Sequence, residues 1–301
     1  SMGTTHARVY DELDETDLVG VYDADAGRAR TVADRLGTEA LPFDDLLETA
    51  SAVSVAVPTR YHHDTALECI ERDVDILVEK PFVGDPDEGR ELIERADERD
   101  VTVQVGHVER FNPVVTALQQ LVDDLDVYAV SAERLGPPLD REIGDSVVMD
   151  LMIHDLDVVL DTFGESIQSV GATGRSDGNY AVANAELDSG VVARFAASRV
   201  TQEKVRELTI SARECRVKAD FIDQTIEIHR SSSPEFVRSD GSVRHRHENV
   251  VESVTVERRE PLKNELQSFV EAATTNTEPV VTAEDGLRVL ELTETIVDDI
   301  D

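Results

Sequence analysis

Short apolar runs alternate with amphipathic stretches in the first third of the chain. The runs predict strands, and the stretches between them, in which apolar residues recur every three or four positions, predict helices. The expected strands cover residues 18–22, 52–57, 75–78 and 101–105, and the expected helices cover residues 6–13, 27–36, 64–72 and 86–99. Strands that alternate with helices are typical of βαβ units, so this part predicts an α/β domain built on a parallel sheet.

The pattern changes after Pro113. A helix is expected over residues 114–125, and the long segments that follow alternate apolar with polar residues, as strands of an antiparallel sheet do. Asp188-Ser189-Gly190 stands between two of these segments as a hairpin turn. The expected strands cover residues 127–135, 167–173, 180–187, 191–200, 205–212, 215–219 and 225–228. We therefore expect two domains, residues 1–113 and residues 114–301, the second with a mainly antiparallel sheet.

The last quarter of the chain combines a polar stretch with two helices. Residues 230–248 are expected to form a surface loop or a hairpin. Helices are expected over residues 261–274 and 283–300. Thr282 precedes the second helix and Asp285 follows three residues later, which is the spacing of a capping box.

The net charge of −35 narrows the partners that the chain is expected to have. The 64 Asp and Glu residues outnumber the 29 Lys and Arg residues, and they are spread through segments with clear hydrophobic periodicity. Such a surface repels nucleic acid and anionic membranes, so neither is expected as a partner. It is typical of halophilic proteins in a salt-filled cytoplasm, where molar salt screens surface repulsion beyond about 3 Å.

A cytoplasmic protein without a metal site is expected. No apolar run approaches the roughly 18 residues of a membrane span, and the first residues lack the basic-then-apolar pattern of a signal peptide. Cys69 and Cys215 lie far apart and are interpreted as reduced packing residues, and CxxC metal spacing is absent. His245-Arg246-His247 lies in the polar stretch and is interpreted as solvated.

The start of the chain carries partial signs of a dinucleotide site. Such a site consists of a strand, a GxGxxG turn, a helix and an acidic residue about 20 positions later. Only the last glycine has a counterpart, Gly3, and Asp23 follows at the expected distance. The Asp23 carboxylate would accept both hydroxyls of the adenosine ribose and repel a 2′-phosphate. Taken alone, Gly3 could belong to a linker and Asp23 to a loop. The order of helix and strand around these two residues favours a cofactor site.

Glu79-Lys80-Pro81 directly follows an apolar strand. Ligands of open α/β sheets bind at the carboxyl ends of strands, and Pro81 favours an extended backbone at Lys80. A lysine in this position is often only a surface residue. This chain has four lysines in all, so Lys80 is a candidate catalytic residue.

Asp150 and His154 are four residues apart, which places them on one face of a helix, with Asp157 a further turn along. Apolar residues recur on the opposite face. One interpretation is that these polar residues form only the solvated face of an amphipathic helix. The other is that they bind and activate a substrate.

Together these residues resemble the Gfo/Idh/MocA family of oxidoreductases, across essentially the whole chain. Its members join a Rossmann domain to an open antiparallel-sheet domain, with E-K-P after a Rossmann strand and D-x-x-x-H in the second domain. A P-x-x-x-H turn matches residues 58–62, and a G-x-x-x-R-F-N-P segment matches residues 106–113. The resemblance implies NAD as cofactor and a catalytic trio of Lys80, Asp150 and His154. It implies cofactor contacts from Gly3, Asp23, Val57, Pro58, Thr59, His62, Glu79 and Lys80, and substrate contacts from His107, Arg110, Asp150 and His154.

Within the family, residues 1–10, 106–115, 134–137 and 150–157 resemble most closely the members that act on UDP-N-acetylglucosamine. This implies oxidation of a secondary hydroxyl, at C3 of that nucleotide sugar, in a homo-oligomer that is a dimer or a tetramer. The first Rossmann strand and the first two glycines have no counterpart in the sequence. We therefore expect a Rossmann domain that is truncated at its N-terminus and lacks its first strand.

The implied reaction passes hydride from a sugar carbon to the nicotinamide. His154 is a suitable base near neutral pH, Lys80 would stabilise charge on the developing alkoxide, and Asp150 would position the sugar or orient His154. The sequence leaves open whether Lys80 or His154 removes the proton. Two other functions stay open: a dehydrogenase of another sugar or of inositol, and a non-catalytic NAD-binding sensor, against which the intact trio argues.

Overall fold

The computed structural model describes residues 2–138, 144–231, 235–239, 242–246 and 249–300, with the side chains of residues 235–246 left aside. The chain divides into two compact units. Unit 1 contains residues 1–111 and 259–292, and unit 2 contains residues 112–258 and 293–301. His245-Arg246-His247, interpreted from the sequence as solvated, therefore lies outside the described side chains.

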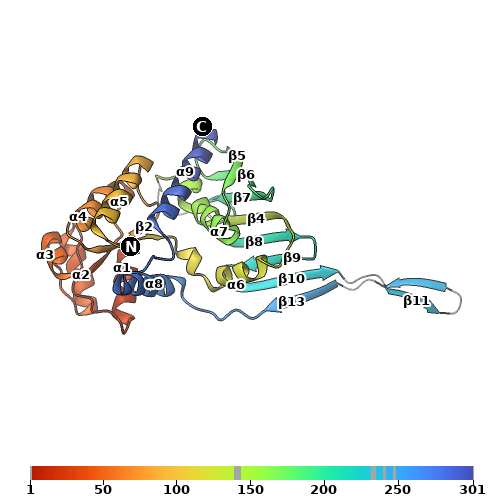
Figure 1. Cartoon of the computed structure of the whole chain (residues 1–301), viewed down its shortest axis with the longest axis horizontal. Helices are drawn as coiled ribbons and strands as arrows, with labels where there is room; N and C mark the ends of the chain where they lie inside the picture. Colours follow the sequence, from red (N-terminus) through yellow and green to blue (C-terminus); the bar gives the residue numbers. More distant parts are fainter. Residues whose placement is uncertain (1, 139–143, 232–234, 240–241, 247–248, 301) are drawn as a thin grey trace. The chain divides into compact units, whose positions relative to one another are not determined.

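Unit 1 is built on three parallel strands in the order β1-β2-β3 (Figure 1). The strands are β1 (Ala52–Val55), β2 (Asp75–Glu79) and β3 (Val103–Gly106). The helices are α1 (Met2–Glu12), α2 (Ala26–Leu36), α3 (Phe43–Thr49), α4 (His62–Ile70), α5 (Pro86–Arg99) and α8 (Pro261–Thr275), with short 3₁₀ turns at η1 (Thr59–Tyr61) and η2 (Val108–Phe111). The predicted parallel sheet and its flanking helices are confirmed.

The strand expected at residues 18–22 was wrong. Val21 makes only an isolated parallel bridge to Ala40, in which its N–H donates to Glu39 and its carbonyl accepts from Leu41. The apolar run is extended, but its backbone groups pair at a single point instead of along a ladder. Helix α3 was not predicted, because it is only seven residues long and too short to show a helical period.

Caps fix the ends of the unit 1 helices. Asp25 accepts hydrogen bonds from the backbone of Gly27 and Arg28 at the start of α2, and Asp85 does the same for Asp87 at the start of α5. Gly37 ends α2 in the left-handed region, with φ of 69°. These local signals explain why helix boundaries here agree with the sequence pattern.

The C-terminal helix α8 and the first half of α9 (Ala283–Ile300) belong to unit 1. Leu266 and Phe269 of α8 are buried in one apolar cluster with Val9, Leu13 and Leu77. The capping box predicted at the start of α9 is present: the Asp285 N–H donates to the Thr282 hydroxyl, and the Thr282 N–H lies 3.4 Å from the Asp285 carboxylate. The sequence pattern had assigned this segment to the second domain, because periodicity shows which face of a helix is apolar but not which core receives it.

Unit 2 is built on an eight-stranded sheet in the order β13-β10-β9-β8-β4-β7-β6-β5. Its pairs are antiparallel except β4 with β7, which confirms the predicted mainly antiparallel sheet. The strands are β4 (Val127–Leu135), β5 (Ile167–Gly174), β6 (Tyr180–Leu187), β7 (Val192–Ser198), β8 (Val205–Ala212), β9 (Arg216–Asp220), β10 (Thr225–Ser231) and β13 (Asn249–Val254). The predicted hairpin joins β6 to β7, where Gly190 adopts φ of 86°.

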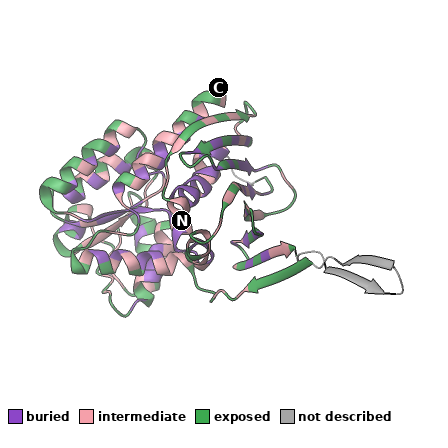
Figure 2. Cartoon of the chain, turned by 45° about the vertical axis from the view of Figure 1, so that its right-hand side comes forward, coloured by how far each residue is buried: buried purple, intermediate pink, exposed green. Residues whose placement is uncertain are grey.

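Helices α6 (Pro113–Val122) and α7 (Ile153–Phe163) cover one face of this sheet, and a π-helical turn, η3 (Val148–Met152), leads into α7. Along β9 and β10 buried and exposed residues alternate, so the opposite face is open to solvent (Figure 2). Within the polar stretch, β11 (Glu235–Ser239) pairs antiparallel with β12 (Ser242–Arg246), which is the hairpin alternative of the prediction. Strand β13 was missed because its residues are almost all exposed and show no apolar alternation.

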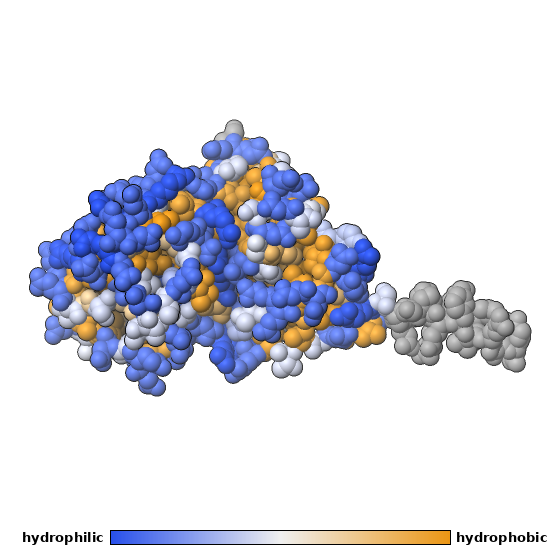
Figure 3. All heavy atoms as spheres, in the orientation of Figure 1, coloured by the Kyte–Doolittle hydropathy of each residue, from blue (hydrophilic) through white to orange (hydrophobic). Residues whose placement is uncertain are grey.

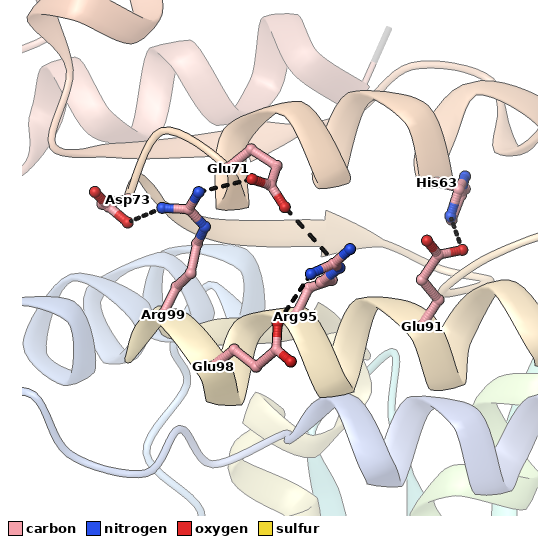
Figure 4. Close-up of polar contacts among 7 residues, drawn as sticks. All are labelled: His63, Glu71, Asp73, Glu91, Arg95, Glu98 and Arg99. Atoms are coloured by element: carbon pink, nitrogen blue, oxygen red, sulfur yellow. Dashed lines mark hydrogen bonds and ion pairs between the residues drawn. The ribbon is translucent and has the colours of Figure 1, made fainter.

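Hydrophilic atoms cover the outer helices of unit 1 (Figure 3). Between α4 and α5, Arg99 pairs with Glu71 and Asp73, and Arg95 pairs with Glu98 (Figure 4). Hydrogen bonds to these carboxylates raise the pKa of both guanidinium groups.

Cys69 and Cys215 are free and buried, and no described helix is long and apolar enough to cross a bilayer.

We predict that Gly286→Ala destabilises unit 1. A Cβ atom at Gly286 would lie 2.6 Å from Val105 Cγ2, and Val105 is fully buried on β3. We expect a loss of about 1–3 kcal/mol in the free energy of unfolding, because a packed core resists an added carbon. Gly136→Ala is the matched control, since a Cβ there meets no atom within 4 Å. Equal denaturant midpoints for both variants would contradict the prediction.

Candidate active site

Lys80 follows the last residue of β2, at the carboxyl end of the central strand of unit 1. The neighbouring strand β3 ends at Gly106, directly beside Glu79. A Cβ at Gly106 would lie 3.1 Å from Glu79 Cα and 3.3 Å from its carboxylate, so only glycine leaves the Glu79 side chain its present place. His6 of α1 closes the other side, with Nε2 2.9 Å from Glu79 Oε1. The Glu79 carboxylate is thus held from two elements.

His62 joins the two loops that follow β1 and β2. Its Nε2 lies 2.8 Å from the Val57 carbonyl, and its Nδ1 lies 2.9 Å from the Pro81 carbonyl. The ring is 1% exposed, so these contacts are shielded from water. The Lys80–Pro81 peptide is cis. The structure therefore brings together the predicted residues Val57, His62, Glu79 and Lys80 at one edge of the sheet.

The other predicted cofactor residues occupy the amino end of α1 and the loop before α2. Gly3 lies in the first turn of α1, where an added Cβ atom would lie 3.5 Å from Ala56 Cβ. Asp23 is half-buried; its carboxylate accepts from the Asp25 N–H and lies 3.1 Å from Arg28. Arg28 has a side chain 70% exposed, and no sequence signal singled it out.

These features fit a dinucleotide. The first turn of α1 carries no acidic side chain, although acids are abundant elsewhere in the chain. A helix start without acids suits a diphosphate, because the backbone N–H groups of a first turn and the positive end of the helix dipole attract anions. Asp23 supplies a carboxylate of the kind that accepts ribose hydroxyls. Gly3, Asp23 and the loop of Val57 would hold the cofactor.

His107 and Arg110, predicted as substrate contacts, are buried within unit 1. His107 is 1% exposed and Arg110 6% exposed. Arg110 lies 2.8 Å from Asp285 and also donates to the Val280 carbonyl, so it anchors the start of α9. Sequence alone could not show this, because Asp285 is 175 residues away from Arg110.

Asp150 lies in the π-helical turn η3 of unit 2, and His154 lies at the start of α7. Both are half-buried. Arg199, at the end of β7, donates to Asp150 at 2.8 Å and to the Asp145 carbonyl at 2.8 Å. Arg199 is 7% exposed, so it is a buried cation that fixes the Asp150 carboxylate. π-Helical turns are rare and occur often at functional sites.

The interpretation of this helix as a merely solvated face was wrong for Asp157. Asp157 is 0% exposed and Asp155 2% exposed, while Ile153 and Leu156 are also fully buried. Arg134 of β4 reaches Asp155 with Nε at 3.0 Å and Nη2 at 2.7 Å. Buried acids occur where a partner compensates the charge, and that partner comes from a distant strand. Arg134 and Arg199 were not predicted as site residues, since a strand pattern does not distinguish a buried arginine from an exposed one.

Three comparisons with known proteins bear on both units. A family model described as "Oxidoreductase family, NAD-binding Rossmann fold" matches residues 1–107, and one described as "GFO/IDH/MocA C-terminal domain" matches residues 127–229. The chain is 34% identical to a UDP-N-acetylglucosamine 3-dehydrogenase of Acidithiobacillus ferrooxidans over 96% of this chain and 91% of that one. It is 26% identical to an inositol 2-dehydrogenase of Rhizobium meliloti over 98% of this chain and 93% of that one.

Solved structures agree with this assignment. A structure of the Acidithiobacillus ferrooxidans enzyme matches with a TM-score of 0.88 and 32% identity, covering 100% of this chain and 94% of the other. A scyllo-inositol dehydrogenase of Lactobacillus casei with bound NAD(H) matches with a TM-score of 0.80 and 18% identity, covering 99% of this chain and 94% of the other, and shows the shared fold. The predicted family and fold class are confirmed, and the chain belongs to the Gfo/Idh/MocA family of NAD-binding oxidoreductases.

Proposed function

We propose that this NAD-dependent oxidoreductase oxidises a secondary hydroxyl of a nucleotide sugar, at C3 of UDP-N-acetylglucosamine. The observation that carries the proposal is the 34% identity, over nearly the full length of both chains, to an enzyme named for that reaction. The inositol dehydrogenases are the second candidate. Full-length relatives of that kind are 24–26% identical to this chain, and the 31% match covers only 61% of it, so they support inositol less strongly.

In the proposed mechanism each unit contributes part of the chemistry. Bound NAD supplies the hydride acceptor. Lys80 donates a hydrogen bond to the reacting hydroxyl and stabilises negative charge on its oxygen. His154 exchanges a proton with the same hydroxyl, as general base in the oxidation. Asp150, held by Arg199, positions the sugar or orients His154.

A panel of substrates tests the proposal. UDP-N-acetylglucosamine, UDP-glucose, free N-acetylglucosamine and myo-inositol are each incubated with the enzyme and NAD, and the reduced nicotinamide is followed by its absorbance. We expect the highest kcat/KM with UDP-N-acetylglucosamine and a 3-keto product by NMR. A higher kcat/KM with myo-inositol would instead identify the enzyme as an inositol dehydrogenase, the second candidate function. Cofactor binding without turnover of any member would favour a sensor.

We also propose that the NAD-binding domain first gives way to the substrate domain near residue 113, that the chain forms a homo-oligomer, and that it works in a salt-rich cytoplasm. Tyr128 of β4 and Val192 of β7 are 55% and 53% exposed on neighbouring strands, so this part of the sheet presents apolar area to solvent. A dimer or tetramer that covers them would remove this apolar area from water. Light scattering of the purified chain in molar KCl would overturn the oligomer if only the monomer mass were found.

We predict a preference for NAD over NADP, because the Asp23 carboxylate repels a 2′-phosphate. Asp23→Ser should narrow the preference, and the exposed Arg28 beside it should then attract the phosphate. The matched control is the double variant Asp23→Ser/Arg28→Gln, in which the gain with NADP should shrink. Steady-state kcat/KM is measured with both cofactors at one salt concentration. Wild-type enzyme that uses NADP as well as NAD would remove the role assigned to Asp23.

We predict that Lys80→Met, Asp150→Asn and His154→Asn each cut turnover while NAD binding and the melting temperature stay near wild type. Loss of a general base or of an alkoxide-stabilising donor costs about 10²–10⁴-fold in rate. Lys204→Met and His63→Asn, which remove an exposed lysine and a half-buried histidine beside Glu91, are the controls. The double variant Lys80→Met/His154→Asn should lose less than the product of the single losses, since both residues are proposed to act on one hydroxyl. Full activity of His154→Asn would exclude the mechanism.

We predict that stability falls steeply as KCl is removed. With a net charge of −35, lowering the salt from 1 M to 0.1 M lengthens the range of self-repulsion from about 3 Å to about 10 Å. The surface ion pairs of Figure 4 stabilise the fold less at high salt, whereas self-repulsion destabilises it less. The direction in which the melting temperature changes therefore shows which of the two effects is larger. Thermal melts across this range are the measurement. A melting temperature that does not change with KCl would contradict the halophilic proposal.

A further inference from the structure

His62 is the first residue of α4 and lies on the buried face of that helix. Ala66, Cys69 and Ile70 continue this face at the spacing of helical turns, and all three are 0% exposed. The imidazole itself is 1% exposed. The ring is therefore held by a packed helix start, and its nitrogens are shielded from water.

Both ring nitrogens of His62 meet carbonyl oxygens of the protein. Nε2 lies 2.8 Å from the Val57 carbonyl, and Nδ1 lies 2.9 Å from the Pro81 carbonyl and 3.3 Å from the Phe82 carbonyl. Each nitrogen of an imidazole has either one N–H or one lone pair for hydrogen bonding, so the protein occupies both. The ring thus has no nitrogen left for the cofactor contact that the family resemblance implies.

The acceptors around the ring favour Nδ1 as the donor. Two carbonyl oxygens lie near Nδ1, and one lies near Nε2. A neutral imidazole carries one N–H, and a proton on Nδ1 satisfies the side of the ring that has more acceptors. A doubly protonated ring carries this proton as well. In both forms the ring donates to Pro81, the residue that directly follows Lys80.

The Val57 and Pro81 carbonyls belong to loops that leave neighbouring strands at the same level. Val55 of β1 pairs with Val78 of β2 in the parallel register. Val57 stands two residues after Val55, and Lys80 stands two residues after Val78. One imidazole therefore bridges the two loops at the level of Lys80.

Lys80 lies between two anchored segments. Before it, Glu79 pairs with Gly106 at the last register position of β2 and β3. After it, residues 81–83 are buried, and the carbonyl of the first of them is held by His62. The backbone on both sides of Lys80 is thus held in place, which fixes the point from which its side chain extends.

We propose that His62 is a positioning residue for Lys80. The Nδ1–H group holds the Pro81 carbonyl and so keeps the Lys80 ammonium within reach of the reacting hydroxyl. The Nε2 contact ties the loop of Val57 to the same point, and the ring does not contact NAD. This inference rests on the proposed function, because it requires Lys80 to act on the hydroxyl that is oxidised.

Two substitutions separate the two contacts of the ring. The amide nitrogen of asparagine is as many bonds from Cβ as Nδ1, and that of glutamine is as many as Nε2. His62→Asn therefore keeps a donor toward Pro81, and His62→Gln keeps one toward Val57. Both variants bury an amide in place of an imidazole, so each is the matched control of the other. The kcat, the KM and the NAD dissociation constant are measured on the full chain, with the sugar that the wild type oxidises.

We expect His62→Gln to lower kcat by about 10–10²-fold, since a misplacement of about 1 Å can cost about 10²-fold in rate. His62→Asn should keep most of the wild-type kcat, and the NAD dissociation constant should stay near wild type in both variants. His63→Gln is a second control, because the ring of His63 points to Glu91 of α5 (Figure 4). It should change neither kcat nor NAD binding.

A double-mutant cycle tests whether His62 acts through Lys80. If it does, His62→Gln should cause no further loss of turnover in the Lys80→Met background. An equal loss factor in both backgrounds, with Lys80→Met impaired by itself, overturns this inference and leaves the proposed mechanism standing. Full turnover of Lys80→Met overturns both.

The inference is also overturned if His62→Gln weakens NAD binding while kcat stays unchanged, since the ring would then be a cofactor contact. Equal kcat losses in His62→Asn and His62→Gln overturn it too, because a purely structural role does not distinguish the two contacts. Melting temperatures are measured for every variant, so that unfolding is not mistaken for lost positioning.

A measurement on the wild type needs no variant to fold. ¹⁵N NMR of the His62 ring distinguishes a protonated nitrogen from one with a lone pair. Nδ1 should carry a proton both with and without NAD. An Nδ1 without a proton in the NAD-bound enzyme overturns the inference, whichever sugar is oxidised.

Discussion

A single buried imidazole ties together the two loops on which the cofactor edge of unit 1 depends. His62 reaches the Val57 carbonyl after β1 and the Pro81 carbonyl after β2, and its ring is shielded from water. A neutral imidazole donates to one of these two carbonyls, and breaking that buried hydrogen bond would leave a desolvated group whose cost water cannot offset. The two loops therefore keep their spacing. Reacting groups must be held in near-attack geometry, so a backbone tie beside Lys80 bears directly on catalysis.

The Glu79 carboxylate shows how a close approach of two strands prepares the same edge. Gly106 permits the contact because any Cβ would meet Glu79, and His6 meets the carboxylate from α1. The Glu79 side chain thus occupies the space that Gly106 leaves by having no Cβ, and it contacts His6 on its other side. Lys80, the next residue, emerges from a backbone that has little room to move.

In unit 2, buried arginines hold the candidate site residues in place, whereas in unit 1 contacts with backbone carbonyls do so. Arg134 of β4 compensates Asp155, and Arg199, the residue after β7, compensates Asp150, both at hydrogen-bond distance. Each pairing stabilises a shielded carboxylate, because an unpaired buried charge costs several kcal/mol.

The sequence by itself determined what is local. Alternation and helical period predicted β2, β4, α5 and most other elements, and the capping residue Thr282 predicted where α9 starts. Short motifs around Lys80 and His154 led to the family, because chemistry at a strand end or on a helix face needs particular residues at particular spacings. None of these inferences requires knowing which distant segments meet.

Only the tertiary structure decided what depends on distant contacts. It reduced the strand expected at residues 18–22 to a single bridge, joined α8 and the start of α9 to unit 1, and buried Asp157. It paired Arg110 with Asp285 and Arg199 with Asp150. The physical reason is common to all of them. Burial and charge compensation are set by the neighbours that folding supplies, and a period along the chain does not contain that information.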